Sequence, residues 1–203
     1  MALGSRATKL ADWLTETVGL SISLLKSLDD DDDWTFVIKM HGILEAGLNH
    51  LLLSQLGNQN LSQIVSRLET KNARTGKIAF IKAYDLLPHD ACLFVQLLSE
   101  VRNRAVHDIK NFDLNLKQYL ATLDNKQLKN WRTGLTCWCS KPIDESMPRL
   151  AIENPRAAIY NSCMRIVVAS FSNQIKMETR TELLNAVEGL AKRTDKPDSG
   201  SSG

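Results

Sequence analysis

The sequence lacks long apolar runs and has few cysteines, and each absence excludes a class of protein. No uncharged apolar stretch approaches the roughly 18 residues of a membrane-spanning helix, and Asp12 and Glu16 interrupt the apolar N-terminal region, so we expect neither a membrane span nor a signal peptide. Four cysteines in 203 residues are too few and too scattered for a disulfide framework. These features predict a cytoplasmic protein.

The sequence also lacks the common signatures of catalysis and of DNA binding. It has no Gly-rich phosphate loop, no Gly-x-Ser-x-Gly elbow, no helix-turn-helix signature and no alternating pattern typical of strands. The pair Cys137 and Cys139 lacks the further ligands that tetrahedral zinc requires. We therefore expect neither a metal nor a cofactor. The net charge of +2 is too small to favour nucleic acid on its own, so any RNA or DNA contact must come from a local cluster.

Apolar residues recur at intervals of three and four along most of the chain, which predicts an all-α helical bundle. A hydrophobic content of 43% is enough for a packed core. We expect an N-terminal helix and acidic loop over 1–33, a bundle over 34–135, a helical extension packed on it over 136–191, and a disordered tail over 192–203. The expected helices cover 7–28, 34–56, 61–68, 76–87, 113–123, 124–131, 154–177 and 179–190, and Pro88 opens a further helix that carries the motif residues near its C-terminal end.

Local signals indicate where several of these helices begin and end. Five aspartates at 29–33 end the first helix by mutual repulsion, and Asp33 is the expected N-cap of the second. This run is either a solvated acidic loop or, less in keeping with its spacing, a cation site. Gly57 ends the second helix, and Thr75 and Asp113 are expected caps of later ones. Residues 140–153 predict a loop because they hold two prolines and few periodic apolar residues.

Three helices carry more specific expectations. In the helix over 61–68, Leu61, Ile64, Val65 and Leu68 are expected to face inward. The helix over 154–177 is apolar on two faces, so it is either fully buried or shared between the bundle and a partner subunit. In the helix that follows Pro88, the residues Phe94, Leu97, Leu98, Val101 and Ala105 form the predicted buried stripe.

The end of that last helix carries the polar residues that most suggest a function. Asn103 and His107 are four residues apart, so they share a helix face, and that face lies nearly opposite the buried stripe. Arg102 lies on the flank, roughly 140° from His107 on an ideal helix. We therefore expect Asn103 and His107 to point at solvent, at another segment or at a second copy of the chain. Arginine and histidine are also ordinary residues at a helix C-terminus, where they interact favourably with the helix dipole.

The stretch Val101-Arg-Asn-Arg-Ala-Val-His-Asp108 resembles the Arg-Asn-x-x-x-His signature of the HEPN superfamily. Upstream, Lys77-Ile-Ala-Phe-Ile-Lys-Ala-Tyr-Asp-Leu-Leu-Pro88 precedes the motif helix as in that superfamily. Farther upstream, Gly42-Ile-Leu-Glu-Ala-Gly-Leu-Asn-His-Leu-Leu-Leu53 is similar to the HEPN helix that carries an acidic residue. The arrangement is most similar to the mannitol operon repressor family, and it covers roughly Trp34 to Tyr119.

The resemblance implies a bundle that forms a homodimer in which two motif copies face each other, and active relatives cleave RNA without a metal. His107 would then move a proton to or from the ribose or the leaving oxygen, Arg102 would bind the scissile phosphate, and Asn103 would position either group. Glu45 would orient the motif side chains, or is simply a surface carboxylate. Arg104 is the other expected supporting residue.

Several alternatives stay open at this stage. The basic residues Lys71, Arg74, Lys77 and Lys82 are either solvated surface or, if they face Arg102 and Arg104, a phosphate-binding patch. The intact motif favours a metal-independent endoribonuclease, with RNA as ligand. The near-neutral charge favours a non-catalytic regulatory or interaction module with a nucleotide, an antitoxin or a regulatory protein as partner.

Overall fold

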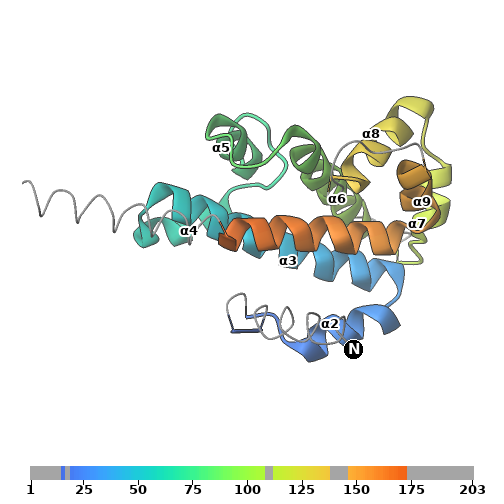
Figure 1. Cartoon of the computed structure of the whole chain (residues 1–203), viewed down its shortest axis with the longest axis horizontal. Coiled ribbons are helices and arrows are strands. Elements are labelled where there is room, and N and C mark those ends of the chain that lie inside the picture. Colours follow the sequence, from blue (N-terminus) through green and yellow to red (C-terminus); the bar gives the residue numbers. More distant parts are fainter. Residues whose placement is uncertain (1–14, 17–18, 108–111, 138–145, 173–203) are drawn as a thin grey trace, which may run out of the picture.

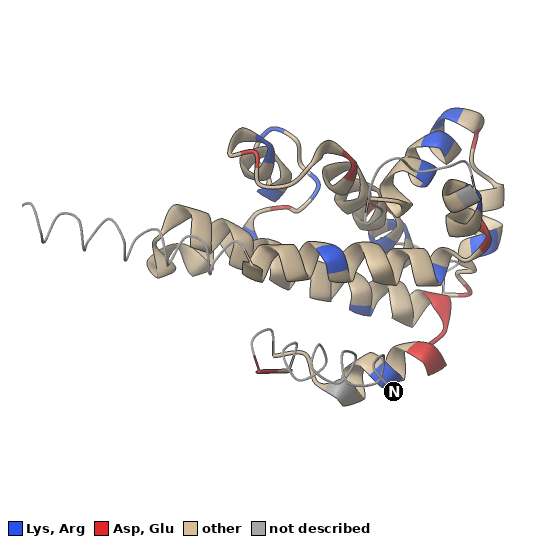
Figure 2. Ribbon diagram, viewed as in Figure 1, with Lys and Arg blue, Asp and Glu red and all other residues tan. Residues whose placement is uncertain are grey.

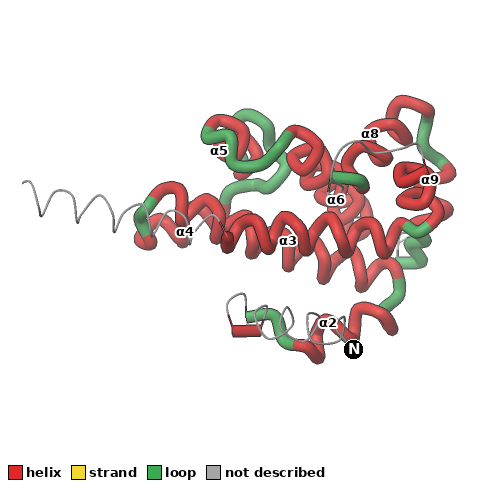
Figure 3. The backbone as a smooth tube through the Cα atoms, viewed as in Figure 1, coloured by secondary structure: helices red, strands yellow, loops and turns green. Residues whose placement is uncertain are grey.

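The computed structural model describes residues 15–16, 19–107, 112–137 and 146–172, and this part of the chain folds as a bundle of helices (Figure 1). Figure 3 shows only helices and connecting loops in it, and no strand occurs among these residues. The predicted all-α helical bundle is therefore confirmed. In the same part of the chain, no helix is both long and apolar enough to cross a membrane.

The helices follow one another with short connections. Their bounds are α2 (Ile22–Asp30), α3 (Asp33–Leu56), η2 (Gln59–Leu61), α4 (Ser62–Arg67), α5 (Lys77–Ala83), α6 (His89–His107), α7 (Leu116–Ala121), α8 (Asn125–Leu135) and α9 (Ser146–Glu153). A further helix covers residues 155–172 and is called helix 155–172 below.

Helix α3 is the centre of the bundle. Asp32 caps its start by accepting a 2.6 Å hydrogen bond from the Thr35 amide, and Gly57, with a φ of 62°, ends it. Helix 155–172 runs beside it (Figure 1), and the two backbones approach so closely at Gly47 that an added Cβ would lie 3.0 Å from the Val167 side chain. The predicted core stripe of this helix is buried throughout: Val37, Met40, Leu44, Leu48, Leu51 and Leu52.

Helix α6 packs along α3 in the antiparallel direction. The His41 ring contacts Ser99, and seven residues earlier on α3 the Trp34 indole donates a 3.0 Å hydrogen bond to the Ala105 carbonyl on α6. Helix α8 covers another side of α6. The buried stripe predicted for α6 is confirmed for Phe94, Leu97, Leu98, Val101 and Ala105. The motif therefore lies on a helix that packing holds in place along most of its length.

Two of the five aspartates form a structural junction, whereas Asp29, Asp30 and Asp32 are exposed to solvent. Asp31 forms a 2.8 Å ion pair with Lys39, and Asp33 forms one of 2.9 Å with Arg156. Asp33 also accepts a 2.7 Å hydrogen bond from the Leu116 amide at the start of α7. The expected cap is wrong by one residue, because Asp32 caps α3 and leaves Asp33 available for these longer-range contacts.

Several expected helix boundaries also differ from the structure. Residues 7–14 and 17–18 of the helix expected over 7–28 lie outside the described residues; in the described part, Gly19 has a φ of 73° and α2 begins only after its cap Ser21. Asn115 caps α7 in place of Asp113, and Gly76 precedes α5 without any side-chain cap from Thr75. Helix α5 ends at Ala83, before the expected residue 87, because the chain turns through Asp85 with a φ of 52°.

Two further expectations were wrong, and others lie outside the described residues. The second half of the loop expected over 140–153 is helix α9, in which Pro148 occupies the first turn, where a proline removes no helical hydrogen bond. Ile64 on α4 is 60% exposed and does not face the core. The helix expected over 179–190 and the tail expected over 192–203 lie outside the described residues.

Of the two apolar faces expected on helix 155–172, one is confirmed to be buried. Asn154 and Pro155 begin it as expected, and the first stripe is buried: Ile159, Cys163, Ile166 and Val167. On the second stripe Phe171 is buried, while Met164 and Val168 are only partly buried.

Candidate functional site

The first two motif residues contact each other at the C-terminal end of α6. The Arg102 guanidinium donates a 3.1 Å hydrogen bond from Nη1 to Oδ1 of Asn103, and both side chains are half-buried. Among the described residues no carboxylate forms an ion pair with Arg102. A guanidinium has five N–H donors, so most of those on Arg102 stay available for an anion.

His107 is the last residue of α6 and is exposed to solvent. It follows Asn103 by one helical turn, so both lie on the outer face of the helix, as the spacing predicted. The structure thus joins Arg102 to Asn103 directly. His107 is linked to these two residues only through the backbone of α6, because the Arg102 side chain points toward Asn103 and not toward His107.

Arg104 points to a different neighbour. Its guanidinium lies 5.5 Å from the centre of the Tyr119 ring, which in turn meets the Trp131 ring edge-on at 6.0 Å. Burial raises the pKa of Tyr119, while the nearby Arg104 charge opposes that shift. Arg104 therefore links α6 to α7 and α8, and the structure gives it no direct contact with Arg102.

Helix α8, which packs on α6, has a basic exposed surface. It carries Lys126, Lys129 and Arg132, all exposed, and no acidic residue (Figure 2). The spacing of the apolar residues gave no signal of this cluster, because the three side chains lie outside the buried face. The basic surface expected over residues 71–82 is weaker than the sequence suggested, since Lys77 is fully buried.

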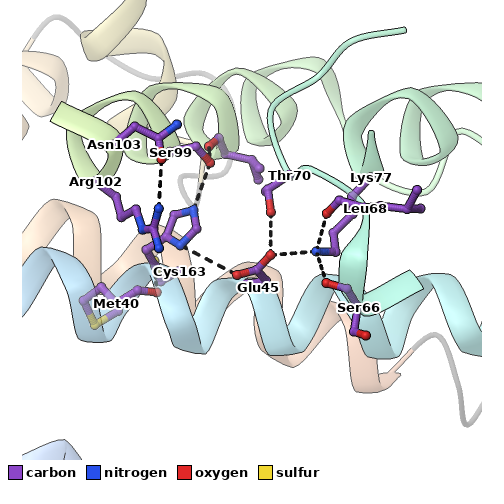
Figure 4. A network of polar contacts seen from close by, with 12 residues as sticks. Met40, Glu45, Ser66, Leu68, Thr70, Lys77, Ser99, Arg102, Asn103 and Cys163 are labelled. Atoms are coloured by element: carbon purple, nitrogen blue, oxygen red, sulfur yellow. Dashed lines mark hydrogen bonds and ion pairs between the residues drawn. The ribbon is translucent and has the colours of Figure 1, made fainter. Parts of the chain in front are cut away.

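Glu45 belongs to a buried network that holds α3, α5 and the connection between α4 and α5 together (Figure 4). Its carboxylate accepts a 2.6 Å hydrogen bond from the ammonium of Lys77 and one of 2.9 Å from the hydroxyl of Thr70. The Lys77 ammonium also donates to the backbone carbonyls of Leu68 at 2.8 Å and Ser66 at 3.4 Å. These bonds satisfy a lysine that has no exposed surface.

This network corrects the expectation for Glu45. Its carboxylate does not contact Arg102 or His107, and it is not a plain surface group either, because its side chain is only 35% exposed and is ion-paired. Burial raises the pKa of Glu45, but the hydrogen bonds from Lys77 and Thr70 outweigh burial and leave that pKa below its ordinary value. Glu45 therefore stays ionised as the counter-charge of Lys77.

His41 lies between Glu45 and the motif, and the sequence reasoning missed its role. Ser99 donates its hydroxyl proton to the Val95 carbonyl at 2.7 Å, so the 3.1 Å contact between Ser99 and His41 requires that Nε2 of His41 be the donor. The pKa of His41 is lowered, first by burial and then by the charges of Arg102 and Lys77, while Glu45 opposes the shift. A neutral His41 therefore borders the Arg102 side of α6.

Two aromatic residues complete the surroundings of the motif. Trp34, which donates to the Ala105 carbonyl, holds the ring of Phe112 at a centroid distance of 5.3 Å and an angle of 66°. Ala105 lies between Arg102 and His107 in the sequence. Trp34 and Phe112 are far apart in the sequence, so no local pattern connects them with each other or with the motif.

Two pockets of the described residues lie away from the motif. Two pockets of about 480 Å³ each flank Arg156, one between α2 and helix 155–172 and the other between α7 and the start of helix 155–172. Neither is lined by Arg102, Asn103 or His107. Within the described residues, no three His, Cys, Asp or Glu side chains are arranged to bind one metal ion.

Comparisons of the chain with protein-family models, with curated proteins and with solved structures found no match. The chemistry of the site must therefore be argued from its own residues. What these residues offer is a half-buried cation with available N–H donors, an amide that holds it, and an exposed imidazole one turn later.

Proposed function

We propose that this protein is a metal-independent endoribonuclease that binds RNA at the C-terminal end of α6. The observation that carries the proposal is the Arg102 guanidinium, which Asn103 holds and which no carboxylate of the described residues neutralises. A fixed, unneutralised guanidinium is suited to bind a phosphate through two parallel hydrogen bonds. The similarity to the HEPN signature supports the same assignment.

In the proposed reaction the RNA supplies its own nucleophile. His107, as a neutral imidazole, accepts the proton of a ribose 2′-hydroxyl, and O2′ attacks the adjacent phosphorus. Arg102 stabilises the negative charge that develops on the phosphate oxygens. The bond from phosphorus to O5′ then breaks, and O5′ takes a proton from a second imidazole. The products are a 2′,3′-cyclic phosphate and a 5′-hydroxyl, and DNA is not cleaved because it lacks the nucleophile.

The second imidazole is the reason we propose a homodimer. Of the described histidines near the motif, His41 is buried against Ser99, so one chain presents a single exposed imidazole there. A two-fold contact between the outer faces of two α6 helices would bring a second His107 to the same phosphate. Each copy would then supply either the base or the acid.

The second candidate is a non-catalytic regulatory or interaction module. It is favoured by the position of Glu45, which is engaged by Lys77 and Thr70 and gives the motif no acidic partner. In that case the same Arg102 and Asn103 would bind RNA, a nucleotide or a protein partner such as an antitoxin without turnover.

The test is RNA cleavage in the presence of EDTA by the parent protein, by His107→Ala and by His89→Ala. His89 is the matched control, because it is an exposed histidine at the opposite end of the same helix. We expect the parent and His89→Ala to release 2′,3′-cyclic phosphate ends and His107→Ala to release none. RNA binding without cleavage by any of the three would favour the module, and equal cleavage by all three would remove the motif from the reaction.

A further inference from the structure

Phe112 is an exposed aromatic residue beside the motif that the proposed reaction does not use. Phe112 is 55% exposed, although phenylalanine side chains in folded proteins are usually buried. Ile64, Phe80 and Tyr84 are also exposed. They lie on α4, on α5 and directly after α5, and not on the helix that carries the motif.

The Phe112 ring is held in place and not merely exposed. It meets the Trp34 ring edge-on, with centroids 5.3 Å apart, and the half-buried Trp34 is itself fixed by its hydrogen bond to the Ala105 carbonyl. Ala105 is three residues after Arg102 on α6, an axial separation of about 4.5 Å on an ideal helix. The motif helix thus fixes the position of an exposed aromatic surface.

The order of contacts along the junction of α3 and α6 places this ring near the phosphate-binding cation. The His41–Ser99 contact lies on one side of Arg102, and the Trp34–Ala105 contact lies on the other. Because the two helices are antiparallel, Arg102 falls between these contacts along the junction. The Trp34 side carries Phe112, and the outer face of the same helix end carries His107.

This combination of a flat apolar surface and a nearby cation matches one kind of ligand. A single-stranded nucleic acid presents an aromatic base and an anionic phosphate in each nucleotide, and such strands are bound by aromatic stacking beside basic side chains. One base covers one ring, and the positive charge of Arg102 favours a polyanion as the ligand.

We propose that Phe112 is a stacking platform for one base of a single-stranded RNA whose phosphate is bound by Arg102. The inference rests on the proposed function in that RNA is the ligand, but it does not require cleavage. It adds a base-binding position to a site that otherwise contacts only the backbone of the strand.

The experiment measures binding with a strand that cannot be cleaved. Fluorescence anisotropy gives the Kd of a short 2′-O-methyl RNA, which lacks the attacking hydroxyl, and of an abasic strand of the same length. The proteins are the parent, Phe112→Ala, Phe112→Trp and Arg102→Gln, with Phe80→Ala as the matched control because Phe80 is an exposed phenylalanine on α5. Thermal unfolding and light scattering of each variant report its folding and its oligomeric state.

We expect Phe112→Ala to weaken binding of the base-bearing strand by about five- to 150-fold, the range for losing one stacked base. Binding of the abasic strand should not change. Phe112→Trp should bind at least as tightly as the parent, Phe80→Ala should match the parent, and Arg102→Gln should weaken binding of both strands.

Three results would overturn the inference. They are an equal loss on both strands, a change in oligomeric state that accounts for the loss, and absence of RNA binding by the parent. A failure of the proposed function is distinguishable from these results. If binding depends on Phe112 but natural RNA is not cut, the ribonuclease assignment fails and the base platform stands. If natural RNA is cut and binding is indifferent to Phe112, only the platform fails.

Discussion

Lys77 shows most clearly how a residue can differ from what its type suggests. A lysine within a polar, basic stretch is usually solvated, yet this one is fully buried and bonded to Glu45 and to two backbone carbonyls. A buried charge is tolerated only when it is paired and its hydrogen bonds are satisfied. Glu45 is therefore first of all a structural residue.

We expect Glu45→Gln to lower the free energy of unfolding by about 2 to 4 kcal/mol, because the Lys77 ammonium would lose its only carboxylate partner among the described residues. The Glu45 side chain is 35% exposed, so we expect this loss of unfolding free energy to be no larger than the loss usual for a broken buried ion pair. Urea denaturation measures the change. The double variant Glu45→Gln with Lys77→Met should recover most of the loss, and an unfolding free energy equal to that of the parent in the single variant would contradict this role.

His41 predicts a specific dependence of stability on pH. Burial, Arg102 and Lys77 lower its pKa in the folded protein below the ordinary value of 6.5. As the pH falls below about 6.5, the unfolded chain therefore binds the proton first, and the free energy of unfolding decreases until the folded-state pKa is reached. The slope is at most about 1.4 kcal/mol per pH unit.

The measurement is the free energy of unfolding from about pH 7 to pH 5 for the parent and for His41→Gln, whose amide can still donate to Ser99. The difference between the two should shrink as the pH falls, because the other histidines are common to both proteins. Parallel pH profiles would show that His41 titrates alike in the folded and unfolded states.

At the scale of residues, the sequence predicted the helix face on which a residue lies better than it predicted which residues contact each other. The spacing of Asn103 and His107 correctly placed them on the outer face of α6, because helical periodicity depends only on local geometry. The contacts of Glu45 with Lys77, of His41 with Ser99 and of Trp34 with Phe112 join residues far apart in the sequence. No local pattern encodes them, and they appear only once the helices are packed.

At the scale of elements, the contact between helix 155–172 and the junction of α2 and α3 is the strongest polar link. Arg156 donates to the Asp33 carboxylate at 2.9 Å, to the Asp31 carbonyl at 2.8 Å and to the Leu28 carbonyl at 2.6 Å. Its guanidinium also lies 4.5 Å from the centre of the Phe36 ring. One side chain thus ties the start of α3 to a helix more than a hundred residues later.

We expect Arg156→Gln to destabilise the protein by about 2 to 3 kcal/mol, because it removes a partly buried ion pair and leaves two backbone carbonyls with fewer donors. Arg149→Gln is the matched control. It also breaks an arginine ion pair, but that pair is exposed on α9, so solvent screening should leave the free energy of unfolding almost unchanged. Similar losses in the two variants on urea denaturation would contradict the special role of Arg156.

The helices with a long apolar period were predicted best, α3 almost to the residue and α6 in its start after Pro88 and in its buried stripe, because burial of a wide stripe dominates their stability. The errors are at short elements and at ends. Two prolines made residues 140–153 predict a loop, yet Pro148 fits the first turn of α9. At Gly19 and at the junction of α2 and α3, tertiary contacts and left-handed backbone geometry decided the boundary, and neither is visible in periodicity.

At the scale of the molecule, the helical bundle followed directly from the sequence, whereas the site was predicted only in its motif. The bundle presents the end of α6, with Arg102, Asn103 and His107, on a surface with exposed basic and aromatic neighbours. The central claim is that this surface becomes a ribonuclease when two copies meet, so that one active site combines Arg102 with the His107 side chains of both chains.

Mixing the parent with an inactive variant tests that claim most directly. The parent and His107→Ala are purified separately, mixed in equal amounts, allowed to exchange subunits, and assayed for RNA cleavage in EDTA, with an equal mixture of the parent and His89→Ala as the control. A mixed dimer of the parent and His107→Ala has only one His107, so we predict that the activity of the parent falls to about half after subunit exchange, whereas the control mixture loses none. If the parent keeps its full activity after exchange with His107→Ala, the account of a site shared between two chains is contradicted.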